Sequence, residues 1–193
     1  MNLYSFAKAV VSAVFYPLYR IRVTGRENFP KDGGILLCAN HIHALDPPVV
    51  GITSPRPVHF MAKEELFEAP ILKGLIPKLN AFPVKRGMSD RKAMRTGLSL
   101  LREGKVVGLF PEGTRSQDGK LQEGLAGAGF FALRGNADVM PCAVIGSYKP
   151  FRRLKVVYGE PIKMEPFRER KASAEEVTKV IMAEIGKLIE TNQ

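Results

Sequence analysis

Several features are scarce or missing in this 193-residue sequence. The two cysteines, Cys38 and Cys142, each stand inside an apolar run, so we expect small buried side chains in a reducing compartment and no disulfide framework. No apolar run reaches the roughly 18–20 residues that a membrane-spanning helix needs. The N-terminal apolar stretch is interrupted by Lys8 and lacks a small-residue cleavage site, so we expect no signal peptide. Internal repeats and low-complexity tracts are also missing, which excludes repeat architectures.

What is present is the composition of an ordinary globular protein, with 45% apolar and 25% charged residues. The length fits one domain, or one domain with an appendage. The net charge is +10, and basic residues are concentrated in stretches 1–31, 85–105 and 149–171, whereas the tail 172–193 is net negative. Such a charge is either a plain solvated face or a surface for phosphate-bearing partners, namely nucleic acid, an anionic membrane or a phosphorylated substrate.

Short continuous apolar runs are typical of buried strands in a parallel sheet. These runs are residues 35–39, 58–62, 81–84, 106–110, 139–145 and 154–158. Helices are expected between and after them, at 64–76, at 90–102 with Ser89 as N-cap, at 124–134, and from Ser173, which forms a capping box with Glu176. Strands that alternate with helices predict an α/β fold, with a mostly parallel central sheet flanked by helices.

The N-terminal residues 3–18 repeat apolar side chains at helical spacing, and Arg20, Arg22 and Arg26 follow at once. Two interpretations compete. The helix packs on the body of its own protein, or it lies in a membrane interface with its apolar side down and the arginines on anionic headgroups.

The stretch NHIHALDP, residues 40–47, holds two of the three histidines together with Asp46. A strand-to-helix turn would bring Asp46 back to His41, and a carboxylate that accepts from one ring nitrogen makes the other more basic. His41 is then a candidate general base, acting on a hydroxyl of the substrate because no serine stands nearby. Two alternatives stay open: His41, His43 and Asp46 are acceptable zinc ligands, or Asp46 only caps a helix.

The stretch FPEGTRS follows another predicted strand. Gly113 permits a sharp turn. Beyond it Arg115 can grip a phosphate bidentately, and the hydroxyl of Thr114 can add a donor. Glu112 can hold that arginine or accept from a substrate hydroxyl. The alternative is a turn with an exposed ion pair.

The stretch FPVKRG places Lys85 and Arg86 at the end of a third predicted strand, where they offer a second phosphate contact or are simply solvated. Loops that leave the C-terminal ends of parallel strands gather at one edge of the sheet. We therefore expect all three motifs to line one cleft.

Together these stretches resemble the glycerophospholipid acyltransferase family. NHIHALD resembles its H-x4-D signature, FPEGTRS its second hallmark, FPVKRG its arginine-bearing block and VMPCAVIG its proline-centred hydrophobic block. Order and spacing also match, over residues 24–161. The resemblance implies acyl transfer from a thioester, on coenzyme A or acyl carrier protein, to a glycerophosphate-type hydroxyl. Lysophosphatidic acid is the expected acceptor and phosphatidic acid the expected product.

By this resemblance His41 is the base and Asp46 its orienting partner, while Pro141 shapes the pocket or acyl channel. The residues expected to bind the acceptor are Glu112, Gly113, Thr114, Arg115, Arg86 and Lys85. Neither a metal nor a cofactor is implied beyond the acyl-CoA or acyl-ACP co-substrate.

An acceptor with a fatty chain resides in a bilayer, and an interfacial helix would let it enter without leaving the lipid. We therefore expect a membrane-interface helix, 1–22, and an acyltransferase domain, 23–193, docked peripherally on anionic lipids at the cytoplasmic face of the cell membrane. Glycerol 3-phosphate or another lysophospholipid is the alternative acceptor. Outside this chemistry the alternatives are a metallohydrolase or a nucleic-acid-binding protein. We expect no nucleic-acid partner because few aromatics interleave with the basic loops.

Overall fold

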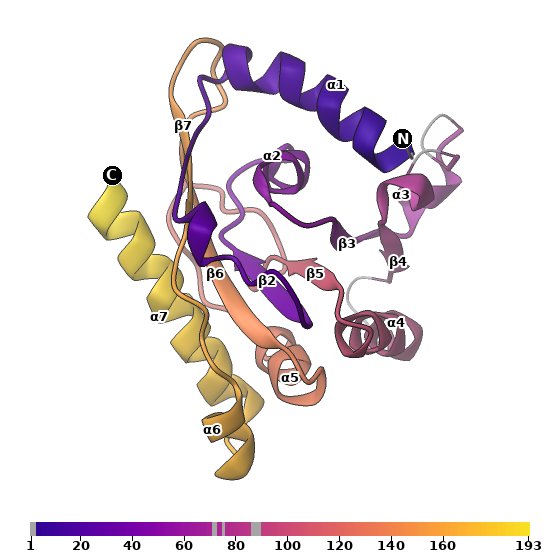
Figure 1. Ribbon diagram of the computed structural model, residues 1–193, viewed down its shortest axis with the longest axis vertical. Helices are drawn as coiled ribbons and strands as arrows, with labels where there is room; N and C mark the ends of the chain where they lie inside the picture. The colour runs from indigo at the N-terminus through magenta and orange to yellow at the C-terminus, as the bar shows by residue number, and fades with distance from the viewer. Residues whose placement is uncertain (1–2, 71–72, 75, 86–89) are drawn as a thin grey trace.

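A central β-sheet with helices on both faces organises the computed structural model, which describes residues 3–70, 73–74, 76–85 and 90–193 (Figure 1). The strand order across the sheet is β1-β7-β6-β2-β5-β3-β4. The strands are β1 (Arg22–Thr24), β2 (Ile35–Ala39), β3 (Val58–Lys63), β4 (Phe82–Val84), β5 (Val106–Leu109), β6 (Asp138–Gly146) and β7 (Leu154–Tyr158).

Neighbouring strands are parallel except β6 and β7, which pair antiparallel because a short turn joins them directly. The predicted α/β fold with a mostly parallel sheet is therefore confirmed, and all six predicted strands are present. The sequence did not predict β1. This strand has three residues at the edge of the sheet and lacks the apolar run that marks a buried strand.

The helices are α1 (Leu3–Leu18), α2 (Asp46–Thr53), α3 (Glu65–Glu68), α4 (Arg91–Arg102), α5 (Gly127–Arg134), α6 (Glu165–Glu169) and α7 (Ala174–Asn192). Two 3-10 turns, η1 (Arg26–Asn28) and η2 (Pro77–Leu79), complete the described elements. The α1 and α2 helices cover one face of the sheet, and α4, α5 and α7 cover the other (Figure 1).

Local signals explain where these helices start and stop. The predicted helix 64–76 is wrong: α3 is a single turn, because Ala69 precedes Pro70 and is held in the extended region. The cap of α4 is Asp90, whose carboxylate accepts from two backbone amides at 3.0 Å, whereas Ser89 lies outside the described residues. The Ser173 cap of α7 is confirmed, with a 3.1 Å bond from the amide of Glu176.

Strand β2 lies at the centre of the core and is buried along its whole length. Its side chains alternate between the two faces: Leu37 packs in the apolar layer under α1 and α2, and Leu36 and Cys38 in the layer under α4, α5 and α7. Cys142 is buried as well, and burial raises the pKa of both thiols. The prediction that both cysteines are small core residues is confirmed.

Helix α1 divides its apolar side chains between the protein and the outside. Val11, Phe15, Tyr16 and Leu18 pack against the core, as the first interpretation expected. The outward side chains Leu3, Phe6, Val10 and Val14 are each 42–52% exposed. Arg22 already begins β1, so the helical part of segment 1–22 ends at Leu18. Within the described residues, no helix combines the length and the apolar character that crossing a membrane requires.

Candidate active site

The carboxyl ends of β2 and β5 bring the two main motifs together. These strands are hydrogen-bonded neighbours, so the loops that follow them start side by side. The amide of Ser116 donates to the carbonyl of His41 at 2.8 Å, which joins FPEGTRS directly to NHIHALDP. The third motif follows β4, at the edge of the sheet and separated from β5 by β3. The common edge is therefore confirmed, and among the described residues the contact is between the first two motifs.

A histidine–carboxylate pair lies at the centre of this edge. His41 Nδ1 is 2.7 Å from Asp46 Oδ2, and their side chains are 10% and 0% exposed. The same oxygen accepts from the amides of Ile42 and His43, both at 2.7 Å. The other oxygen accepts from the Tyr148 hydroxyl at 2.6 Å. Three donors besides the imidazole therefore hold this buried carboxylate in place, as buried polar groups require.

The remaining ring nitrogen of His41, Nε2, is open to solvent. No described residue bonds to it, and no buried nitrogen or oxygen of a described side chain lacks a partner. The ring stacks on Phe110, with centroids 4.2 Å apart and planes at 22°, and Phe110 stacks in turn on Phe60. Asp46 and the aromatic stack therefore fix the ring and leave Nε2 without a partner among the described residues, so that it can accept a proton from a ligand.

Asp46 does not cap a helix, so that alternative is wrong. It is the first residue of α2, which shows no side-chain cap, and its carboxylate turns back to the preceding loop. Pro47 and Pro48 suit the first turn because the amides there need no helical partner.

The side chain of His43 is engaged in contacts within the protein. Its Nδ1 accepts from the amide of Leu45 at 3.2 Å, and its ring stacks on Tyr148 at 4.4 Å between centroids. Nowhere in the described part of the chain do three or more histidine, cysteine or acidic side chains gather as a metal site requires.

Glu112 joins the two loops from the inside. It is 5% exposed, and its carboxylate oxygens accept from the amides of His41 at 2.6 Å and Gln122 at 3.0 Å. Burial raises the pKa of Glu112, and the two amide donors act in the opposite direction. This geometry differs from the expected substrate contact, because both oxygens are taken up by backbone donors. It favours a role for Glu112 in positioning His41.

The residues after Glu112 are available to a ligand. Gly113 adopts φ 71°, a left-handed conformation that suits the sharp turn expected there. Gly113, Thr114 and Arg115 are exposed. The Arg115 guanidinium has no hydrogen-bond or ion-pair partner within the described residues. An unpaired arginine beside a turn of this kind is suited to an anion.

The remaining predicted residues are Lys85, Arg86 and Pro141. Lys85 is exposed and forms an ion pair with Glu64 at 3.6 Å. Arg86 lies outside the described residues, so its contact with the acceptor stays a prediction. Pro141 is buried in the middle of β6 and does not line the pocket described below.

Two residues of the site were missed from the sequence. The Asn40 side chain bridges both backbone groups of Val144, at 2.7 and 2.9 Å, and so ties the end of β2 to β6. Tyr148 donates to Asp46 and packs edge-on against Tyr19, beyond the end of α1. Burial, followed by the Asp46 charge, raises the pKa of Tyr148, so its hydroxyl keeps the proton that it donates. Asn40 opens the NHIHALDP stretch, but the sequence does not show what either side chain contacts, because their partners are 104 and 102 positions away.

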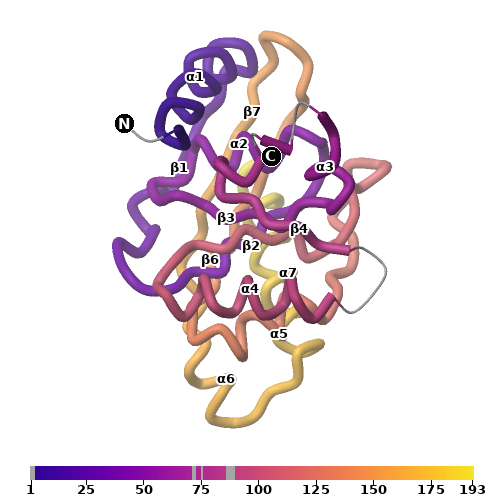
Figure 2. The backbone as a smooth tube through the Cα atoms, turned by 90° about the vertical axis from the view of Figure 1, so that its right-hand side faces the viewer, coloured from indigo at the N-terminus to yellow at the C-terminus, as the bar shows by residue number. Residues whose placement is uncertain are grey.

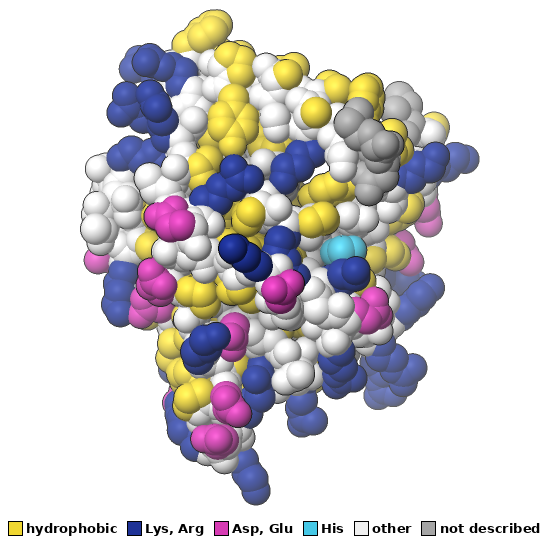
Figure 3. Space-filling model, in the orientation of Figure 1, with side chains coloured by type: hydrophobic (Ala, Val, Ile, Leu, Met, Phe, Trp, Pro, Cys, Tyr) yellow, Lys and Arg dark blue, Asp and Glu magenta, His cyan; other side chains and the backbone are white. Residues whose placement is uncertain are grey.

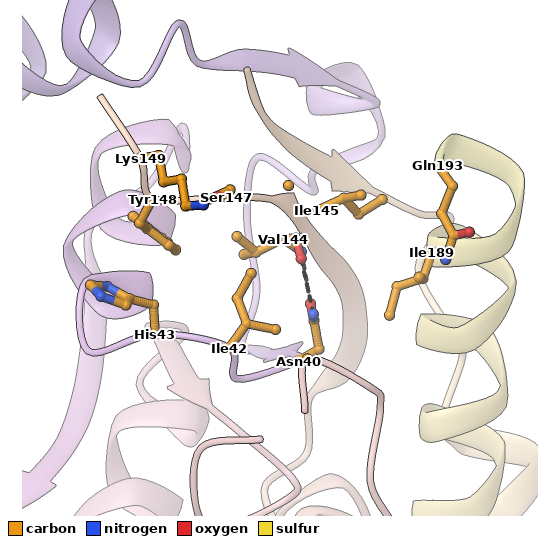
Figure 4. A pocket seen from close by; sticks show the side chains of 12 residues that line it. Asn40, Ile42, His43, Val144, Ile145, Ser147, Tyr148, Lys149, Ile189 and Gln193 are labelled. Atoms are coloured by element: carbon orange, nitrogen blue, oxygen red, sulfur yellow. Dashed lines mark hydrogen bonds between the residues drawn. The ribbon is translucent and has the colours of Figure 1, made fainter. Parts of the chain in front are cut away.

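A pocket of about 530 Å³ opens beside the histidine–carboxylate pair. Ile42 and His43 form one side, Tyr148 and Lys149 another, and the end of α7 with Ile189 the third (Figure 4). The pocket combines apolar walls with one cationic side chain, which suits a ligand that has both an apolar and an anionic part.

This fold and site belong to a known class. The acyltransferase family model matches residues 20–145, and the chain belongs to the acyltransferase family. The resemblance noted in the motifs is thereby confirmed.

The names of individual relatives state a particular acyltransferase activity. The chain is 31% identical over 172 residues to the 1-acyl-sn-glycerol-3-phosphate acyltransferase of Bacillus subtilis, covering 86% of this chain and 85% of the relative. It is 32% identical over 124 residues to the Borreliella burgdorferi protein of that name, covering 63% of this chain and 50% of the relative. The crystal structure of the 1-acyl-sn-glycerophosphate (LPA) acyltransferase PlsC from Thermotoga maritima superposes with a TM-score of 0.77 at 26% identity. That match covers 98% of this chain and 78% of the other.

Proposed function

We propose that this chain transfers a fatty acyl group from an acyl thioester to the free hydroxyl of lysophosphatidic acid, giving phosphatidic acid for phospholipid synthesis. The observation that carries the proposal is the 2.7 Å His41–Asp46 contact, with Nε2 open to solvent on the edge where Arg115 is unpaired. The names of the relatives support the choice of acceptor. The donor is acyl-CoA or acyl carrier protein, which present the same thioester.

The chemistry follows from the fixed imidazole. His41 Nε2 takes the proton of the acceptor hydroxyl while its oxygen attacks the thioester carbonyl carbon. Asp46 stabilises the imidazolium that forms. The tetrahedral intermediate collapses with cleavage of the carbon–sulfur bond, and the imidazolium returns its proton to the thiolate. The products are an oxygen ester and a free thiol. General-base action of this kind contributes roughly 10²–10⁴ in rate.

The acceptor phosphate is assigned to the turn that follows Glu112. The Arg115 guanidinium supplies a bidentate donor. The amides of Thr114 and Arg115 have no hydrogen-bond partner in the described part of the chain, and they follow the left-handed Gly113. Backbone amides around such a residue form an anion-binding concavity. Because this turn is bonded to the loop of His41, a phosphate held there leaves the attached hydroxyl close to Nε2.

The lipid nature of the acceptor assigns a role to α1. Its outward side chains form an apolar stripe, and basic residues follow its C-terminal end. This pattern suits a helix that lies in the headgroup region of an anionic bilayer. The protein is then peripheral, on the cytoplasmic face, and takes the acceptor from the lipid.

The test is acyl transfer by the purified protein, with lysophosphatidic acid or glycerol 3-phosphate as acceptor and acyl-CoA or acyl-ACP as donor. We expect phosphatidic acid from lysophosphatidic acid, and a roughly 10²–10⁴-fold loss of kcat in His41→Ala. His59→Gln is the matched control. His59 bonds to the carbonyl of Val106, at the start of β5 and the opposite end from the site, so activity should be retained. Full activity of His41→Ala would show that His41 is not the base. Transfer to glycerol 3-phosphate alone would show that the acceptor is glycerol 3-phosphate and not lysophosphatidic acid.

A further inference from the structure

The turn between β6 and β7, residues 147–153, carries an aromatic side chain that the catalytic proposal does not use. Phe151 is 71% exposed, more than any other large hydrophobic side chain in the described part of the chain. Its φ is 63°, a left-handed conformation that bulky residues rarely adopt. A backbone conformation unfavourable for phenylalanine holds this ring in water, which points to a partner that covers it.

Backbone hydrogen bonds attach this turn to the end of α1. The amide of Phe151 donates to the carbonyl of Leu18 at 2.6 Å, and the amide of Leu154 donates to that of Tyr19 at 3.0 Å. The turn and α1 consequently stand together at one end of the molecule in both views (Figures 1 and 2). Hydrophobic side chains lie along the top of the molecule, at this end, and lysines and arginines gather at its upper left (Figure 3). The backbone bond to Leu18 therefore places Phe151 at the C-terminal end of α1, whose outward side chains are also exposed and apolar.

The two segments that carry α1 and the turn have charge of one sign. No acidic residue occurs in segments 1–26 or 139–159. The exposed basic side chains of these segments are Arg20, Arg22, Arg26, Lys149, Arg152 and Arg153. A pocket of about 400 Å³ between β1 and β7 is lined by Arg22, Thr24, Arg153, Lys155, Val157 and Asn192. Three cationic side chains around one hollow suit a phosphate group.

We propose that this turn is a second membrane anchor. Phe151 inserts into the boundary between headgroups and acyl chains of an anionic bilayer, and Arg152 and Arg153 bind lipid phosphates beside it. The inference rests on the proposed function, which places the acceptor in a bilayer. It adds the orientation of the protein on the bilayer. Because both α1 and the turn contact the lipid, the protein cannot rotate about the axis of α1. Tyr148 and Lys149, in the same turn, line the pocket beside Asp46, so docking presents that pocket to the lipid.

A fluorescence experiment tests insertion directly, since the chain contains no tryptophan. Phe151→Trp supplies the only indole. On vesicles of phosphatidylglycerol and phosphatidylcholine we expect its emission to move to shorter wavelength, and lipids brominated on their acyl chains to quench it. Glu169→Trp, an exposed position on α6 at the far end of the molecule, is the matched control and should show neither effect (Figure 1). Unchanged emission of Phe151→Trp on vesicles that sediment with the protein would overturn the proposal.

Partition coefficients give the second measurement. Phe151→Asn removes the ring and keeps a residue that tolerates a positive φ, so folding is preserved. We expect a roughly tenfold weaker partition onto anionic vesicles. Arg152→Gln and Arg153→Gln should each weaken it about fivefold on anionic vesicles and not on neutral ones. Acyl transfer to a water-dispersed short-chain acceptor should stay at the wild-type rate in all three variants.

The outcomes separate this inference from the proposed function. Wild-type protein that transfers acyl groups but binds no vesicles would refute membrane docking as a whole. Wild-type protein that binds, together with Phe151→Asn that binds equally well, would refute the second anchor alone. Partition of the arginine variants onto anionic vesicles at the wild-type level would refute the contact between these arginines and lipid phosphates.

Discussion

The Tyr148 hydroxyl offers the sharpest test of how the buried Asp46 is held. Tyr148→Phe keeps the ring, and with it the packing on His43 and Tyr19, and removes only the donor 2.6 Å from Asp46 Oδ1. Asp46 is fully buried, and no other described residue bonds to Oδ1. A hydrogen bond to a buried charged group contributes about 1.5–3 kcal/mol. We expect the free energy of unfolding, measured by urea denaturation, to fall by that amount.

Tyr158→Phe is the matched control for this measurement. The Tyr158 hydroxyl is also buried, but its partners are neutral: the Thr53 hydroxyl at 2.9 Å and the Val50 carbonyl at 3.4 Å. Its removal should cost only about 0.5–1.5 kcal/mol. A double-mutant cycle of Tyr148→Phe with Asp46→Asn isolates the pair. Additive effects in that cycle would refute the reasoning, because the two groups would then not interact.

The same substitution has a kinetic consequence. Tyr148 acts on the reaction only through Asp46, so kcat should fall while the KM of donor and acceptor stays near the wild-type value. If the loss of the Tyr148 donor loosens the Asp46 carboxylate and raises the activation free energy by about 1.4 kcal/mol, kcat falls roughly tenfold. A change confined to KM would instead mean that Tyr148 serves the neighbouring pocket.

Three further predictions concern other parts of the site and core. Arg115→Ala should raise the acceptor KM roughly tenfold or more with little change in kcat, and an unaltered KM in steady-state kinetics would show that the phosphate is held elsewhere. Glu112→Gln places an amide donor against a backbone N–H; thermal unfolding should reveal a loss of about 1–3 kcal/mol, and kcat should fall because the His41 loop shifts. Cys38 and Cys142 should resist a thiol reagent until the protein is denatured, since both are buried with raised pKa values; labelling of the native protein would contradict this.

The features that the sequence predicted correctly are those whose physical cause is local. Continuous apolar runs mark strands buried on both faces, so the central strands could be predicted within a residue or two. The His41–Asp46 contact spans five positions, and the amides that hold Asp46 lie within the same loop. A turn of that length closes on itself, so the motif contains most of its own geometry. The helix predicted at 64–76 failed because Pro70 interrupts a pattern that periodicity alone would continue.

Tertiary structure decided the rest of the site. The Glu112 contact joins residues 71 positions apart, the Tyr148 contact 102 and the Asn40 contact 104. Each depends on the order β6-β2-β5 in the sheet, which places the ends of three strands from distant parts of the chain next to one another. Strand order is set by the packing of the whole core, and periodicity within a segment carries no record of it. The sequence by itself therefore determined the reactive pair, and only the fold determined which groups hold that pair in place.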